Sequence, residues 1–261
     1  MKEELYKRIL ETDLKYVKCF SDCYEEEKVI NLKDSKLRDM YMHNFSFFKK
    51  LVKKDELINF IEKKLQEAEK EHTKYVHIMM DDEMATYDLM SIFPDIEITE
   101  YCVMTIKPEI FNKLKINKDC VVLKADTKET LRDGISADIQ ANKAAMGEFV
   151  NKRIMRKQEV YQSIPDLNFY VCYKGNEPIG KCEFFIKDGI GKIEDFDIIE
   201  EYQRQGYGTS VVQKLLNDAY CANVNIVYLI TDNSDTAKEM YQKCGFSIKG
   251  IKTSLLFTLY E

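Results

Sequence analysis

The first half of this chain contains no glycine: all ten glycines of the 261 residues lie at Gly134 or later. Glycine lets a backbone approach a phosphate group closely, so residues 1–117 cannot present a glycine-based phosphate loop. A break in composition of this kind also indicates two differently built halves. We therefore predict two domains, residues 1–117 and residues 118–261, connected by the segment 107–118, which contains Pro108 and four lysines.

Other absences disfavour whole classes of function. The eight cysteines include no C-x-x-C pair, and all three histidines lie in the first half, so we predict no metal site and expect reduced thiols, as in a cytoplasm. No apolar run approaches the ~18 residues that a membrane-spanning helix needs. The net charge of −6 argues against nucleic-acid binding. We expect a soluble cytoplasmic protein.

The most informative stretch lies between a strand-like run and a helical run. Residues 190–199 alternate apolar and charged side chains imperfectly, as a strand does, and from Val211 to Ala219 the apolar residues recur at the spacing of one helical face. Between these runs lies the segment Gln203-Arg204-Gln205-Gly206-Tyr207-Gly208-Thr209. Glycines at a strand-to-helix junction expose the amides at the helix start, where the helix dipole favours an anion. This segment is predicted to hold a phosphate group.

The segment 203–208 resembles the acyl-CoA motif of the GNAT superfamily of acyl-CoA N-acyltransferases, R/Q-x-x-G-x-G/A. A second stretch, 233–246, resembles the family's N-x-x-A-x-x-x-Y-x-x-x-G-F helix, with Ala237, Tyr241, Gly245 and Phe246 in register. The family's asparagine falls on Ser234, while Asn233 is one residue early. The resemblance covers residues from about 119 to the C-terminus.

This resemblance implies a mixed α/β fold for residues 118–261, with a mostly antiparallel sheet flanked by helices and preceded by a second, smaller α/β domain. The first half also alternates helices and strands, and one hypothesis is that it is a degenerate GNAT-like copy; an unrelated α/β domain is the alternative. The main predicted elements are helices near 1–24, 55–71, 127–139, 149–161 and 211–219, a helix through 241, and strands at 75–80, 97–106, 120–125, 168–173, 179–186, 190–199, 225–231, 246–248 and 253–260.

In this family, backbone amides at the start of the helix hold the pyrophosphate of the cofactor, and the preceding strand pairs with its pantetheine arm. The residues that match these roles here are Ile198, Gln203, Arg204, Gln205, Gly206, Tyr207, Gly208, Thr209, Asn233 and Ser234. The implied co-substrate is acetyl-CoA. Backbone amides near Ile198 would polarise the thioester carbonyl.

Two side chains are candidates for proton transfer. Tyr241 matches the family's general acid, which protonates the leaving thiolate. The strand before the loop offers Glu194 as a base, and strict alternation would place it on one face and the aspartates Asp195 and Asp197 on the other. A chain of water molecules is an alternative base. No histidine lies near Cys182 or Cys244, so direct attack by the amine is preferred over an acyl-enzyme.

We therefore predict an N-acetyltransferase that transfers an acetyl group from acetyl-CoA to a primary amine. Candidate acceptors are a polyamine, an aminoglycoside-like molecule, an amino acid and a protein amine, and the residues leave this choice and the oligomeric state open. One alternative is a non-catalytic acyl-CoA-binding module. Another is an acetyltransferase whose first domain recruits a protein substrate.

Overall fold

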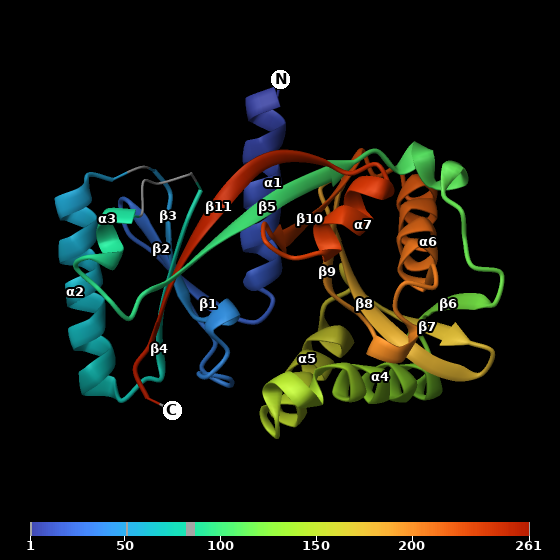
Figure 1. Ribbon diagram of the computed structural model, residues 1–261, viewed down its shortest axis with the longest axis horizontal. Helices are drawn as coiled ribbons and strands as arrows, with labels where there is room; N and C mark the ends of the chain where they lie inside the picture. Colours follow the sequence, from blue (N-terminus) through green and yellow to red (C-terminus); the bar gives the residue numbers. More distant parts are fainter. Residues whose placement is uncertain (1, 51, 82–86, 261) are drawn as a thin grey trace. The chain divides into compact units, whose positions relative to one another are not determined.

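The computed structural model describes residues 2–50, 52–81 and 87–260 (Figure 1). The chain divides into two compact units, and each combines segments that are distant in the sequence. Unit 1 consists of the residues up to Tyr16, Met104–Ile230 and Thr236–Ser247. Unit 2 consists of Val17–Val103, Thr231–Asp235 and the residues from Ile248 onward.

The predicted boundary between residues 117 and 118 falls inside unit 1. A division into folding domains at that point stays a prediction, as does the hypothesis of a degenerate GNAT-like copy in the first half. Among the described residues, no helix is long and apolar enough to cross a membrane.

Unit 2 is built around strands in the order β1-β2-β3-β4-β11-β5. β3 runs parallel to β4, while β11 pairs antiparallel with β4 from Thr253 opposite Met80 to Thr258 opposite Tyr75. The elements are β1 (Asp22–Glu25), β2 (Val29–Lys33), η1 (Tyr41–His43), β3 (Phe45–Phe48), α2 (Lys54–Glu71), β4 (Tyr75–Met80), α3 (Tyr87–Met90), β5 (Glu97–Ile106) and β11 (Ser247–Thr258).

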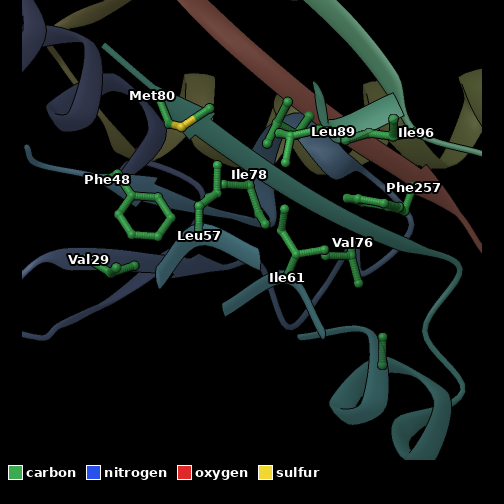
Figure 2. Close-up of a cluster of buried hydrophobic side chains, with 12 residues drawn as sticks. Val29, Phe48, Leu57, Ile61, Val76, Ile78, Met80, Leu89, Ile96 and Phe257 are labelled. Carbon is green, nitrogen blue, oxygen red and sulfur yellow. The ribbon is translucent and has the colours of Figure 1, made fainter. Parts of the chain in front are cut away.

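The core of unit 2 lies between α2 and this sheet (Figure 2). Leu57 and Ile61, one helical turn apart on α2, are completely buried against apolar side chains of the strands. Those strand residues are Val29, Phe48, Val76, Ile78, Met80, Leu255 and Phe257. Each fully buried side chain of this size stabilises the fold by about 1.5–3 kcal/mol, so α2 and β11 depend on each other for their place in unit 2.

A buried histidine of β4, His77, connects η1 to β11 within the same unit. His77 Nδ1 lies 3.0 Å from the carbonyl oxygen of Tyr41, and His77 Nε2 lies 2.9 Å from Ser254 Oγ. Because a carbonyl oxygen only accepts, Nδ1 carries the proton, and Nε2 is free to accept from the serine hydroxyl. Burial, against the opposing effect of the Tyr41 hydrogen bond, lowers the pKa of His77 to about 4.

We predict a loss of stability in mild acid that originates at His77. In the unfolded chain this side chain titrates near 6.5, so between pH 6.5 and about 4 the unfolded state binds more protons than the native state. The free energy of unfolding should fall over this window, by about 3 kcal/mol once the pH is below 4. Urea unfolding at a series of pH values measures the slope. In His77→Gln the slope should be shallower, and an unchanged slope would contradict the prediction.

Unit 1 contains strands in the order β10-β9-β8-β7-β6. β6, β7, β8 and β9 pair antiparallel in sequence, and β10 runs parallel to β9. The elements are α1 (Lys2–Val17), η2 (Pro108–Lys113), β6 (Cys120–Lys124), α4 (Lys128–Met146), α5 (Phe149–Ser163), β7 (Leu167–Lys174), β8 (Glu177–Lys187), β9 (Ile190–Ile198), η3 (Glu200–Tyr202), α6 (Tyr207–Cys221), β10 (Ile226–Asp232) and α7 (Ala237–Lys243).

Helices cover both faces of this sheet: α4 and α5 lie on one side of β7 and β8, and α6 lies on the other (Figure 1). On the first side, a Cβ added to Gly134 of α4 would lie 2.4 Å from the Phe169 ring, so glycine permits the close approach of helix and strand. On the second side, the Tyr170 hydroxyl donates to Asp218 of α6 at 2.9 Å. The predicted GNAT-type layering of a mixed sheet between helices is confirmed.

Most predicted elements match, and the differences are local. The helix predicted near 127–139 is α4, and its N-cap Thr127 forms a capping box with Thr130. The two final strands predicted at 246–248 and 253–260 are one continuous strand, β11. Short strands β1 and β2 were not predicted, since their polar residues interrupt the apolar alternation.

Candidate active site

The parallel pairing of β9 with β10 covers only the first part of each strand. The register runs from Ile190 opposite Ile226 to Ile193 opposite Leu229, while β9 continues to Ile198. Burial changes at the same place: residues 190–193 are buried, and residues 194–198 are only half-buried. The second half of β9 therefore has a backbone edge beyond its register with β10, as a strand does when an extended ligand pairs with it.

A β-bulge lies at the point where this half begins. Glu183 of β8 lies opposite Glu194, but Lys181 lies opposite Asp197, so β9 has one extra residue. Asp195 takes up that residue with a φ of 47°, in the left-handed region. Because opposed residues share a face, Glu194 and Asp197 lie on one face. The prediction that Glu194 and the aspartates face opposite ways is wrong, since strict alternation assumes an unbroken strand.

The turn after β9 has the backbone that the glycine pattern predicts. Arg204 has a φ of 61° and Gly206 a φ of 86°, and Gly206 is the N-cap of α6 without a capping side chain. Left-handed residues next to a helix start gather backbone N–H groups into a concave anion site. Within the described chain, no side-chain cap occupies the first amides of α6.

Side chains of the turn hold its shape rather than extending from it. Gln203 Nε2 donates to the carbonyl of Ile198 at 2.9 Å, and Gln205 Nε2 donates to the carbonyl of Glu201 at 2.9 Å. Arg204 is exposed, with Nη2 3.4 Å from Thr236 Oγ1. The two glutamines thus fix the turn, and Arg204 is the side chain with freedom to reach a phosphate.

Asn117 braces the turn from the segment that sequence patterns assigned to the interdomain connection. Its Nδ2 donates to the carbonyl of Gln205 at 2.9 Å, and its backbone N–H donates to Ser210 Oγ at 2.8 Å. Its Oδ1 accepts from the N–H of Asp119, which is a local Asx turn. The composition of residues 117–119 predicts such a turn, but nothing in the sequence indicates that it contacts α6.

The second motif helix, α7, packs on the first turn of α6. A Cβ on Gly208 would lie 2.8 Å from Met240 Sδ, so the second glycine of the motif permits this contact. Tyr207, the residue between the two glycines, is buried. Tyr241, the residue after Met240, is 8% exposed, and its ring packs edge-on against the Phe246 ring with the ring centroids 5.7 Å apart. The structure thus brings α7 to the turn, while the acid role of Tyr241 stays a prediction.

Asn233 and Ser234 belong to unit 2 and form hydrogen bonds there. Asn233 Nδ2 lies 3.3 Å from Glu100 Oε2, and its Oδ1 accepts from Cys102 Sγ at 3.1 Å. Ser234 Oγ donates to Asp232 Oδ1 at 2.7 Å. Their contact with pantetheine stays a prediction.

The candidate base Glu194 is part of a chain of buried charges. Its carboxylate is 26% exposed and lies 2.6 Å from Lys192 Nζ, which in turn lies 2.7 Å from Asp13 of α1. The ammonium of Lys192 also lies over the Tyr16 ring at 4.1 Å. Tyr228 pairs with Lys192 across the strands, and its completely buried hydroxyl has no protein partner. Such an unsatisfied hydroxyl is a place for an ordered water beside this chain.

A larger ion network surrounds the bulge. Arg153 of α5 donates from Nη2 to both carboxylate oxygens of Asp138 of α4, at 2.5 and 2.6 Å, and from Nη1 to Asp195 at 2.9 Å. Lys157, one turn later, lies 2.6 Å from Glu183 and 2.9 Å from Asp195. Burial opposes ionisation of Asp195, but the adjacent cations hold its pKa well below the usual range. Asp195 is therefore ionised at neutral pH.

Lys181 lies at the centre of this network. Oxygens of Asp138, Asp195 and Asp197 lie within 4.8 Å of one another, a spacing that a metal ion could bridge. The Lys181 ammonium contacts all three, at 2.8, 2.7 and 2.8 Å respectively. Burial opposes its charge, yet these carboxylates raise the pKa of Lys181. An ammonium group thus supplies the positive charge that the three carboxylates require.

Four residues of the network, Arg153, Lys157, Lys181 and Glu183, were not among the residues predicted for the site. One signal was present: Lys181 and Glu183 alternate within the otherwise apolar run 179–186. Charged residues at alternate positions of an apolar strand face one side of the sheet, where they are stable only with buried partners.

Comparison with known proteins agrees with this geometry. Residues 140–246 match the family model described as Acetyltransferase (GNAT) family. The chain contains a GNAT acetyltransferase domain. It is 28% identical over 125 residues to the uncharacterized N-acetyltransferase CgeE of Bacillus subtilis (strain 168), an alignment that covers 46% of this chain and 48% of the relative. The chain thus matches about half the length of this curated relative.

Two solved structures share the fold over almost the whole chain. A conserved protein of unknown function from Staphylococcus epidermidis ATCC 12228 has a TM-score of 0.75 at 19% identity, covering 92% of this chain and 95% of that protein. A GCN5-related N-acetyltransferase from Kribbella flavida has a TM-score of 0.69 at 13% identity, covering 96% of this chain and 94% of that protein. At these identities the likeness shows the fold.

We predict that the ion network is a main source of stability in unit 1. Replacing Arg153 by methionine removes the guanidinium shared by Asp138 and Asp195, and should lower the free energy of unfolding by about 3–5 kcal/mol. Lys152→Met is the control on the same helix, because Lys152 is exposed; it should change the value by less than about 1 kcal/mol. Urea denaturation measures both. Equal losses in the two variants would contradict the prediction.

Proposed function

We propose that this protein is an N-acetyltransferase that uses acetyl-CoA and transfers the acetyl group to a primary amine by direct attack. GNAT-family enzymes generally use this co-substrate. The observation that carries the proposal is the end of the β9–β10 register at Ile193 and Leu229, just before an uncapped helix start with a left-handed glycine. The second half of β9 can pair with an extended amide chain, and the start of α6 can hold a diphosphate.

The turn supplies the charge complement for the nucleotide end. Backbone N–H groups of Gly206, Tyr207, Gly208 and Thr209 would bind the pyrophosphate, helped by the positive end of the α6 dipole. Arg204 adds a mobile guanidinium beside them. The Gln203 and Gln205 hydrogen bonds keep the turn in this shape before the cofactor arrives, so little ordering is required on binding.

The half-buried end of β9 supplies the reaction site. Pantetheine would lie along residues 194–198, and amides of this segment would stabilise the oxyanion that forms at the thioester carbonyl. The amine nitrogen attacks that carbon, the C–S bond breaks, and a proton passes from the amine to a base. Glu194, or water held beside it and the Tyr228 hydroxyl, would take that proton, and Tyr241 would protonate the thiolate.

Acetyl-CoA binding should depend on the electrostatics of the turn. Thr209→Glu places a carboxylate at the third residue of α6, where acidic residues stabilise a helix but repel phosphate. We expect a dissociation constant for acetyl-CoA at least about tenfold higher than in the wild type by isothermal titration calorimetry.

Gln213→Glu, one turn further along α6, introduces the same charge and is the control, with a much smaller expected effect. With acetyl-CoA at 100 times its dissociation constant, the wild-type protein should gain about 2.7 kcal/mol of stability in a thermal unfolding assay. No gain at saturating acetyl-CoA would refute the proposed cofactor.

Turnover should depend on Tyr241. Release of free CoA thiol is measured with acetyl-CoA and a panel of spermidine, an aminoglycoside, free amino acids and a peptide with a free N-terminus. With the amine that reacts, Tyr241→Phe should lower kcat by about 100-fold and leave acetyl-CoA affinity unchanged. Tyr220→Phe, at an exposed position of α6, is the control and should behave as wild type.

The rival function is a non-catalytic acyl-CoA-binding module. It would bind acetyl-CoA and show the Thr209→Glu effect, but no amine of the panel would release thiol. Glu194→Gln sharpens the distinction: a loss of kcat with retained binding supports Glu194 as base, and unchanged kcat supports the water alternative.

A further inference from the structure

Two cysteines lie side by side in unit 1, close to the turn before α6. Cys120 on the edge strand β6 and Cys172 on β7 have their sulfur atoms 3.4 Å apart. Val122 lies opposite Cys172 and Cys120 lies opposite Lys174, so the two cysteines are diagonal neighbours on one face of the sheet. The sulfurs are already in contact, and bond formation needs a shift of about 1.4 Å to the disulfide length of about 2.0 Å.

The two thiols have different environments. Cys172 is 1% exposed, and its hydrogen bond with Cys120, together with burial, raises its pKa. Cys120 is half-buried, and the hydrogen bond with Cys172 lowers its pKa despite the effect of burial. Cys120 is thus the more exposed thiol and the one with the lowered pKa, and Cys172 is a neighbour able to react with it afterwards.

Cys120 is also connected to the turn. The backbone N–H of Cys120 donates to the carbonyl oxygen of Asn117 at 3.2 Å. Ser210 Oγ accepts from the N–H of Asn117 at 2.8 Å and donates to the carbonyl of Gly206, the N-cap of α6, at 3.2 Å. A movement of Cys120 therefore reaches the first turn of α6 through Asn117 and Ser210.

We propose that Cys120 and Cys172 form a reversible disulfide on exposure to a peroxide, and that this disulfide weakens cofactor binding at the adjacent turn. The second part rests on the proposed function. The Cys120 thiolate attacks one peroxide oxygen, so that an S–O bond forms, the O–O bond breaks and hydroxide leaves. Cys172, losing its proton, then attacks the sulfenic sulfur, and the S–O bond breaks to release water. Two thiols and one hydrogen peroxide thus give one disulfide and two waters, and a dithiol reductant reverses the change.

β6 can follow this movement because it is an edge strand with little burial. It pairs with β7 on one side only, and three of its five residues are exposed. Disulfide formation draws Cys120 toward β7 and away from Asn117, the acceptor of its backbone N–H. The hydrogen bond that links β6 to the N-cap region of α6 is then lost.

The site is tested on the full chain treated with hydrogen peroxide, blocked with N-ethylmaleimide and digested with trypsin. Mass spectrometry should find one linked pair, residues 119–124 with residues 158–174, that disappears after dithiothreitol. Cys120→Ser and Cys172→Ser should each abolish it. Cys221→Ser, at an exposed cysteine, should leave it intact. Irreversible oxidation of Cys120 without the link, or links spread over other cysteines, would overturn the assignment.

The effect on the turn is tested by titrating acetyl-CoA into reduced and oxidised protein. Loss of one hydrogen bond should raise the dissociation constant about fivefold in the oxidised wild type, with no change in peroxide-treated Cys120→Ser. Equal affinity of the two wild-type forms would refute the coupling. If reduced protein does not bind acetyl-CoA at all, the proposed cofactor fails, whereas the linked peptides still decide whether the disulfide forms.

Discussion

The β-bulge at Asp195 is the feature on which the geometry of unit 1 depends. By adding one residue to β9, it puts the carboxylates of Glu194, Asp195 and Asp197 into one polar region instead of two. Three helices are attached to the sheet through that region. Tyr16 of α1 donates to Glu183 at 2.6 Å, α4 contributes Asp138, and α5 contributes Arg153 and Lys157.

Charge pairing of this kind constrains the fold differently from apolar packing. Apolar side chains can exchange neighbours at small cost, whereas a buried charge that loses its partner keeps its full desolvation penalty. The helices around the bulge are therefore held in one arrangement. Side-chain exposure also increases along the network: Lys181 is completely buried, Asp195 is 16% exposed and Asp197 is 32% exposed. Its open end is the half of β9 at which the proposed reaction takes place.

Sequence patterns predicted what is encoded locally. The strand and helix of residues 190–221, and the turn between them that is predicted to bind phosphate, follow from periodicity and from two glycines. The matching family motif then gives the layered fold. The bulge could not be predicted, because one extra residue in β9 is visible only against the register of β8. Asn117 was missed for a related reason, since its Asx turn is local but its partner, Ser210, is distant in the sequence.

The same limit applies to the compact units, each of which combines segments that are distant in the sequence. A cut in the chain assumes that each half uses its own strands, but β4 needs β11, whose Leu255 and Phe257 belong to the core around α2. A protein fragment made of residues 1–117 lacks that strand. During synthesis the consequence is one of timing: the strands encoded first remain an incomplete sheet with an open edge until residues 248–258 have left the ribosome. Unit 2 contains most of the early sequence, yet it is completed by a late segment.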